Sequence, residues 1–156
     1  MGKKVKLGVI GLGQRGADLV KNVYSEHPDV DFIALCDVYG DRQEEVANAL
    51  VEMGRERPKT FSDYREMLLI KELDAVLICA SWDTHSEIAM AAMRAGKAVA
   101  SEVGGAYTLS ECWKLVDCHE ETKTPIMFME NCVYGRDEMM VYRMAEEGVL
   151  VEIVHC

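Results

Sequence analysis

The sequence predicts an α/β fold with a doubly wound parallel sheet, and three observations lead to this prediction. Apolar, strand-like segments alternate with helix-like segments along almost the whole chain, as in open parallel sheets that carry helices on both faces. Residues 75–80 are apolar at every position, which is typical of a strand covered on both faces. The 156 residues are 49% hydrophobic and include only three prolines, so the chain can bury the core of one domain.

The order of the predicted strands and helices follows from the pattern of apolar residues, and proline and glycine mark several of their ends. Strands are predicted at residues 4–10, 31–37, 59–61, 75–80, 97–101 and 126–130. Helices are predicted at about 14–26, 41–54, 63–70, 83–95, 109–122 and 137–147. Pro28 breaks the first helix, and Gly54, Gly96 and Gly148 follow the ends of three others, as helix-stopping residues do.

The most informative motif is the glycine turn that follows the first predicted strand. It reads Gly11-x-Gly13-x-x-Gly16 and leads directly into a helix. In such a turn Gly11 permits the tight bend, Gly13 lets the backbone approach a pyrophosphate, and Gly16 lets the helix pack close to the strand. The N-terminus of the helix then offers N–H groups and the positive end of its dipole to phosphates. This order of elements predicts a dinucleotide cofactor site.

The second predicted strand ends at Asp37, 21 residues after Gly16. A carboxylate at that place can accept hydrogen bonds from the hydroxyl groups of an adenosine ribose. Its alternative role is to cap the next helix. Val38 and Tyr39 follow, and we expect no adjacent arginine to meet a 2′-phosphate. The sequence therefore favours NAD over NADP.

Composition and charge exclude several classes of function. The formal net charge of −10 argues against nucleic acid or an anionic membrane surface as a partner. We find no apolar signal segment and no run that approaches 18 apolar residues, so we expect a cytoplasmic protein. The six cysteines lack CxxC spacing, which favours reduced thiols buried in the core over disulfides or a metal site.

Over nearly its whole length, the chain resembles the N-terminal half of the Gfo/Idh/MocA oxidoreductases. Most members carry Glu-Lys-Pro at the end of the fifth strand, and the lysine usually takes part in catalysis. Here the matching residues are Glu102, Val103 and Gly104, so that lysine is missing. This departure counts against a standard sugar or polyol dehydrogenase.

A closer resemblance is to glycoside hydrolase family 109, whose members keep an NAD on the same scaffold. It rests on residues 81–85, 129–138 and 148–155, of which the run Glu-Asn-Cys-Val-Tyr-Gly-Arg at 130–136 is the most specific. That family typically has Glu-Val-Pro after the fifth strand and a proline after the fourth. Gly104 and Ser81 therefore depart from its pattern.

The resemblance implies a set of NAD contacts. They are Gln14, Arg15, Asp37, the loop from Trp82 to His85, Glu102, Val103 and Asn131. The members of this set that follow predicted strands lie where open α/β sheets hold ligands. Other roles stay open: Arg15 as a surface charge, His85 as a structural cap, and Glu102 as a solvated strand end. The catalytic residues are unknown, with His85 as one candidate in the cofactor or substrate pocket.

The function implied by this resemblance is that of an NAD-dependent glycoside hydrolase acting by transient oxidation at the sugar 3-position. An ordinary sugar or polyol dehydrogenase and a non-catalytic NAD-sensing module are the alternatives. The general acid/base and most sugar contacts would lie in a second domain. We therefore expect these 156 residues alone to bind NAD and to catalyse little or nothing.

Residues 149–156 are predicted as one more strand, with two interpretations. The strand either pairs at the edge of this domain or opens a second domain, and the resemblance favours the second. We accordingly expect a dinucleotide-binding domain at 1–148 and a stub of a C-terminal domain at 149–156. An unpaired apolar strand edge invites pairing with another copy, so we also expect a homo-oligomer.

Overall fold

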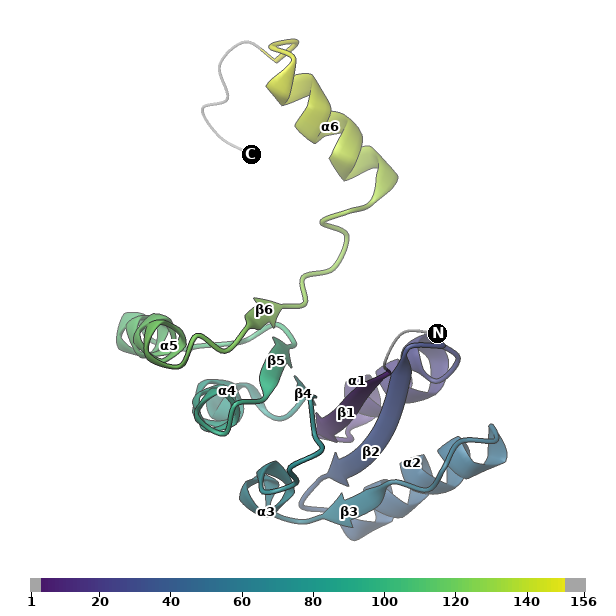
Figure 1. Cartoon of the computed structure of the whole chain (residues 1–156). Coiled ribbons are helices and arrows are strands. Elements are labelled where there is room, and N and C mark those ends of the chain that lie inside the picture. Colours follow the sequence, from purple (N-terminus) through teal and green to yellow (C-terminus); the bar gives the residue numbers. More distant parts are fainter. Residues whose placement is uncertain (1–3, 151–156) are drawn as a thin grey trace.

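The computed structural model describes residues 4–150, which form a six-stranded sheet with flanking helices (Figure 1). The strands are β1 (Val5–Ile10), β2 (Val30–Cys36), β3 (Lys59–Phe61), β4 (Ala75–Ile78), β5 (Ala98–Ser101) and β6 (Ile126–Phe128). Every pairing is parallel, and the order is β3-β2-β1-β4-β5-β6. The chain reverses its direction of winding between β1 and β4, which is where such sheets bind ligands.

The helices fill the intervals between the strands. They are α1 (Gln14–Asp18), its π-helical continuation η1 (Leu19–Tyr24), α2 (Gly40–Glu52), α3 (Tyr64–Leu68), the 3-10 turn η2 (Trp82–Thr84), α4 (His85–Arg94), α5 (Leu109–Thr122) and α6 (Arg136–Glu146). Each strand and helix predicted before residue 148 is present, with ends displaced by one or two residues and with two of the helices divided into segments. The predicted α/β class is confirmed.

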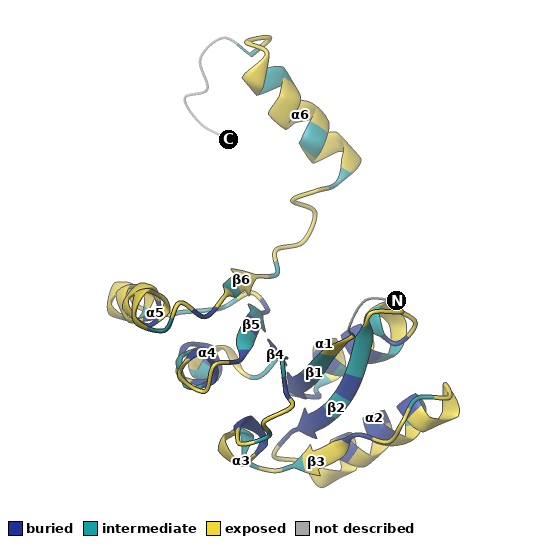
Figure 2. Cartoon of the chain, viewed as in Figure 1, coloured by how far each residue is buried: buried dark blue, intermediate teal, exposed yellow. Residues whose placement is uncertain are grey.

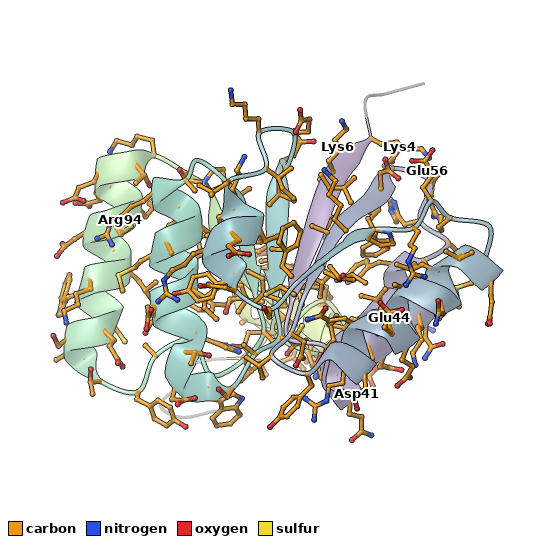
Figure 3. All side chains as sticks on the ribbon, turned by 90° about the horizontal axis from the view of Figure 1, so that it is seen from below. Lys4, Lys6, Asp41, Glu44, Glu56 and Arg94 are labelled. Carbon is orange, nitrogen blue, oxygen red and sulfur yellow. The ribbon has the colours of Figure 1, made fainter. Side chains whose placement is uncertain are left out.

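The core lies in two layers, one on each face of the sheet. Successive residues of a strand point to opposite faces. In β1, Val9 belongs to the cluster that includes Leu50 of α2, whereas Ile10 belongs to the cluster that includes Met93 of α4. Figure 3 shows the helices on both sides of the sheet, with the labelled Arg94 on one side and Asp41 and Glu44 on the other. Burial on both faces explains why the central strands are continuously apolar.

α6 stands away from the sheet (Figure 1), and Figure 2 shows it as exposed or half-buried along its length. None of its residues is buried. Val149 and Leu150, which follow it, form a bend rather than the start of a strand. Residues 151–156 lie outside the described part of the chain, so the predicted terminal strand and the domain it would open stay predictions.

Two further observations concern the whole described segment. Between residues 4 and 150, no helix has the length and apolarity needed to cross a membrane. The cysteines of this segment are all free. Cys36 and Cys118 are buried, but Cys112 and Cys132 are exposed, so the expectation of core thiols was wrong for these two.

Candidate functional site

The glycine turn joins β1 to α1 by a very close approach of backbone to backbone. Gly11 has a φ of +90°, and a Cβ on it would lie 2.5 Å from backbone atoms of Cys79 and Ala80, at the end of β4. A Cβ on Gly16 would overlap the carbonyl oxygen of Gly11. Both positions therefore need glycine for the fold itself.

The middle glycine has a different environment. The nearest atom to a Cβ on Gly13 would be Nη1 of Arg42, at 3.8 Å. Gly13 has a φ of −64°, which other residues can adopt, and it caps the N-terminus of α1 without a side chain. Nothing in the fold requires glycine here, so the open space beside Gly13 is available to a ligand.

A cavity of about 770 Å³ opens beside this turn, across the carboxyl ends of β1 to β4. Its volume is within the range of small-molecule and cofactor sites, about 300–1,000 Å³. It is lined by Ile10, Gly11, Gly13, Cys36, Asp37, Val38, Tyr39, Arg42, Ser62, Asp63, Tyr64, Arg65, Cys79, Ala80, Ser81, Thr84, Glu87 and Ile88. The cavity lies at the topological switch point that the strand order defines.

Asp37 is buried at the rim of this cavity and is held in place by backbone N–H groups. The N–H of Leu12 donates to its Oδ2 at 2.6 Å, and the N–H of Tyr39 donates to its Oδ1 at 3.0 Å. Each carboxylate oxygen keeps a further lone pair for a ligand. The alternative role as a helix cap is not found, because α2 has Tyr39 as its N-cap and no side-chain cap bond.

Arg42 also lines the cavity, and the sequence argument missed it. Its Nη1 lies 3.9 Å from Oδ2 of Asp37, and its guanidinium carbon lies 4.5 Å from the ring centroid of Tyr39. No arginine directly follows Asp37 in the sequence, but the fold brings the guanidinium of Arg42 beside it. The first turn of α2 begins at Gly40 and brings Arg42 back towards the end of β2. An arginine five residues beyond the acidic residue was the signal in the sequence.

Three of the predicted cofactor contacts meet at a second place, where Arg15 bonds to Glu102 and Asn131. Nε of Arg15 donates to Oε1 of Glu102 at 2.8 Å, and Nη2 lies 2.7 Å from the same oxygen. Nη2 also donates to Oδ1 of Asn131 at 3.3 Å. The hydrogen bond to Glu102 raises the pKa of Arg15. The Arg15 side chain thus links the glycine turn to the ends of β5 and β6.

Glu102 is only 9% exposed, so it is not the solvated strand end that was the alternative interpretation. Its Oε2 accepts the N–H of Val103 at 3.2 Å. Val103 lies at the surface, and Gln14 is exposed at the start of α1. Val103 stands on the loop after β5 that carries Glu102, and Gln14 directly precedes Arg15 in α1.

Trp82 covers the loop that follows Glu102. Gly104 has a φ of +100°, and a Cβ on it would lie 2.5 Å from Cγ of the Trp82 ring. The indole therefore lies directly against the Gly104 backbone while 56% of the residue stays exposed. Proline cannot adopt this φ, so the chain's departure from Glu-Val-Pro at this position goes with a different local backbone.

His85 lies in the interior instead of on the cavity wall. It is 1% exposed, its Nε2 is 2.9 Å from the carbonyl oxygen of Ala80, and its Nδ1 is 3.4 Å from Oγ of Ser101. Because a carbonyl only accepts, Nε2–H donates to Ala80, while the Ser101 hydroxyl beside Nδ1 also lies 3.2 Å from the carbonyl oxygen of Glu102 and donates to it. Both ring nitrogens thus face groups of the fold, and Thr84 is the member of the loop that lines the cavity.

Two cysteines line the cavity as neutral thiols. Burial raises the pKa of Cys36 and of Cys79 to about 12, with smaller contributions from Asp37 and Glu102 respectively. Neither is a thiolate, and hence a strong nucleophile, near neutral pH. In the part of the chain that the structure describes, no group of three or more His, Cys, Asp or Glu residues could hold a metal ion.

Comparison with known proteins places the chain among relatives of similar sequence. It is 38% identical over 154 residues to glycosyl hydrolase family 109 protein 2 of Phocaeicola vulgatus, covering 97% of this chain and 37% of that protein. It is 37% identical over 155 residues to a glycosyl hydrolase family 109 protein of Streptomyces niveus, covering 97% of this chain and 31% of that protein. The chain thus spans about a third of the length of these relatives.

Solved structures share the fold. The scyllo-inositol dehydrogenase of Lactobacillus casei, crystallised with NAD(H) and scyllo-inositol, aligns with a TM-score of 0.86 at 19% identity, over 97% of this chain and 43% of that one. A probable dehydrogenase of Thermotoga maritima aligns with a TM-score of 0.79 at 27% identity, over 93% of this chain and 42% of that one.

The profile of the family described as "Oxidoreductase family, NAD-binding Rossmann fold" matches residues 5–130, a span that contains the glycine turn, Asp37 and Glu102. This match agrees with the observed strand order and with the position of the cavity. The chain therefore belongs to the Gfo/Idh/MocA oxidoreductase family and contains its NAD-binding Rossmann domain.

Proposed function

We propose that the chain holds NAD with its adenosine half in the 770 Å³ cavity and its pyrophosphate beside the glycine turn. The open space at Gly13 is the observation that carries this proposal, because Gly11 and Gly16 are explained by the fold whereas Gly13 is not. Asp37 supports it with a buried, oriented carboxylate that can accept the ribose hydroxyls.

The nicotinamide half of the cofactor would contact Arg15, Glu102 and Asn131, which are joined by hydrogen bonds. Glu102 offers a carboxylate to the second ribose, and Asn131 has the donors and acceptors that a carboxamide needs. Trp82 and Val103 would form the adjacent wall, and Gln14 would meet the phosphates from the start of α1. When bound, NAD supplies hydride transfer, while these side chains bind and orient it.

For the whole protein we propose a sugar-active oxidoreductase, in particular an NAD-dependent glycoside hydrolase that oxidises the sugar 3-position transiently. The glycosyl hydrolase family 109 relatives, 37–38% identical over 97% of this chain, support this assignment. Val103 and Gly104 in place of Lys-Pro also favour it over a standard dehydrogenase. These 156 residues would bind the cofactor, and sugar contacts would come from elsewhere in the longer protein.

Calorimetric titration with NAD⁺ tests the cofactor site. In Asp37→Asn the amide oxygen can still accept the hydrogen bond from the Leu12 N–H, but the negative charge proposed to bind the ribose hydroxyls is lost. We expect about tenfold weaker binding or more, since a hydrogen bond to a charged group contributes about 1.5–3 kcal/mol. The matched control is Asp41→Asn, the same change on the first turn of α2 but outside the cavity. Equal affinity of the two variants would contradict the proposed site.

Activity of the whole protein separates the remaining functions. Stoichiometric cleavage of a chromogenic glycoside without net NADH would support the hydrolase. Net NADH production from a free sugar would support an ordinary dehydrogenase, and NAD binding without turnover of either would support a sensing module. From residues 1–156 alone we expect neither glycoside cleavage nor net NADH production.

The expectations of a homo-oligomer and of a cytoplasmic location belong to the same proposal. Light scattering at high protein concentration tests the first, and a clean monomer would contradict it. Fractionation of cells that express the whole protein tests the second.

A further inference from the structure

The Asn131 amide is held in one orientation by its contact with Arg15. Nη2 of Arg15 donates to Oδ1 of Asn131 at 3.3 Å. Because a guanidinium carries only donors, the amide must present its oxygen to Arg15 and direct its nitrogen elsewhere. Asn131 is exposed, and its amide nitrogen makes no hydrogen bond to another residue between 4 and 150. The two N–H bonds of this nitrogen are therefore available to a ligand.

Arg15 can impose this orientation because its guanidinium is itself fixed. Nε and Nη2 lie 2.8 Å and 2.7 Å from Oε1 of Glu102, which is buried. The other oxygen of Glu102 accepts the N–H of Val103 at 3.2 Å, which holds the carboxylate in turn. The guanidinium is planar and rigid, so two bonds to Glu102 also set the direction in which Nη2 donates to Asn131.

An amide fixed in this way distinguishes between the two ends of a carboxamide. The carboxamide of nicotinamide has a carbonyl oxygen that accepts hydrogen bonds and an NH₂ group that donates them. The free nitrogen of Asn131 can donate to the carbonyl oxygen, whereas Oδ1 of Asn131 faces Arg15 and is turned away from the NH₂ group. Recognition by Asn131 therefore requires the carbonyl oxygen and not the NH₂ group.

We propose that Arg15 is a positioning residue that orients the Asn131 amide to donate to the carbonyl oxygen of the nicotinamide carboxamide. The NH₂ group of the carboxamide then contributes nothing to binding by this chain. This inference rests on the proposed cofactor site.

Titration of three ligands into the chain tests the inference. NADH, its 3-acetylpyridine analogue and ADP-ribose carry the same net charge. The analogue keeps the carbonyl oxygen but has a methyl group in place of NH₂, and ADP-ribose lacks the ring. We expect NADH and the analogue to bind equally within about twofold, and both at least about threefold more tightly than ADP-ribose, as one hydrogen bond provides. Binding of NADH that exceeds the analogue by more than about twofold would overturn the proposal.

Asn131→Asp separates the two possible orientations of the amide. A carboxylate can still accept from Arg15 but has no N–H to donate. We expect the affinities of NADH and the analogue to fall to that of ADP-ribose, by about threefold or more, while ADP-ribose binding is unchanged. If Asn131 instead accepted from the NH₂ group, aspartate would keep NADH binding, and that result would contradict the inference.

Arg15→Met tests the positioning role, because methionine has no N–H to hold the amide. We expect the ratio of NADH to ADP-ribose affinity to fall by about threefold. Use of the ratio cancels any contact between Arg15 and the pyrophosphate, which both ligands contain. Circular dichroism checks that the variant is folded. An unchanged ratio would refute the positioning role.

The chain offers a matched control outside the cavity, in which Arg57 bonds to an asparagine and a glutamate. Nη1 of Arg57 donates to Oδ1 of Asn48 at 2.7 Å, and Nη2 donates to Oε2 of Glu44 at 2.6 Å. Arg57 is 44% exposed, close to the 47% of Arg15. Arg57→Met and Asn48→Asp should leave all three affinities unchanged. A fall in the NADH to ADP-ribose ratio in these controls would overturn the assignment to Arg15 and Asn131.

The outcomes also separate this inference from the cofactor site itself. If NADH and ADP-ribose bind with equal affinity, the role of Arg15 and Asn131 is refuted, and the adenosine half of the site stands. If neither ligand binds, both the proposed site and the inference fail.

Discussion

Replacement of Gly16 by alanine separates the packing role of the glycine turn from its ligand role. The added methyl group would overlap the carbonyl oxygen of Gly11, lie 3.1 Å from its carbonyl carbon and lie 3.2 Å from Cβ of Cys79. The obstructing atoms are mainly backbone, so no flexible side chain can turn aside. β1 and α1 must separate to make room.

The size of the effect follows from two opposing contributions. Overpacking costs about 3 kcal/mol at the upper end of its usual range, which backbone obstruction favours. Alanine in place of glycine within a helix stabilises the folded state by about 1 kcal/mol, because alanine has the higher helix propensity. We therefore expect a net loss of about 2 kcal/mol in the free energy of unfolding. With a urea m-value of about 2 kcal/mol/M, the midpoint of unfolding falls by about 1 M.

Gly13→Ala is the matched control, because its methyl group would meet nothing closer than 3.8 Å. We expect its urea midpoint, followed by circular dichroism, to correspond to a change within about 1 kcal/mol. Its affinity for NAD⁺ should fall, since the methyl group takes the space proposed for the pyrophosphate. An unchanged midpoint for Gly16→Ala would refute the packing argument, and undiminished NAD⁺ binding by Gly13→Ala would refute the ligand argument.

Two more predictions concern the cavity and its neighbouring loop. Proline at position 104 cannot keep the φ of +100° that Gly104 has, so in Gly104→Pro the loop must change and release the Trp82 ring. We expect the fluorescence emission of Trp82 to shift to the red, measured in a Trp113→Phe background. An unchanged spectrum would contradict the contact between Trp82 and Gly104. Because burial raises the pKa of Cys36 and Cys79 to about 12, the folded state binds more protons than the unfolded state above about pH 9. These thiols should therefore leave the free energy of unfolding unchanged below pH 9 and lower it as pH rises from 9 towards 12. Urea titrations at several pH values measure this dependence. Mutation of both cysteines to alanine should flatten it.

The sequence by itself determined the fold class and the glycine turn, because their signals are local. Alternation of apolar segments, helix-ending glycines and the apolar run at 75–80 each reflect the backbone geometry of a few neighbouring residues. The spacing of Gly11, Gly13 and Gly16 likewise describes one continuous turn. Asp37 was predictable because the end of a strand fixes its edge of the sheet.

Only the tertiary structure decided which side chains meet at that edge. Arg15 bonds to Glu102 and Asn131, which stand 87 and 116 residues away, because the order of the strands brings α1, β5 and β6 together. The direction of a side chain also depends on the three-dimensional packing around it. Arg42 returns to Asp37 over the first turn of α2, while His85 turns inward to Ala80 and Ser101. Spacing along the chain fixes the element on which a residue lies, but contacts between distant elements depend on how the whole sheet is assembled.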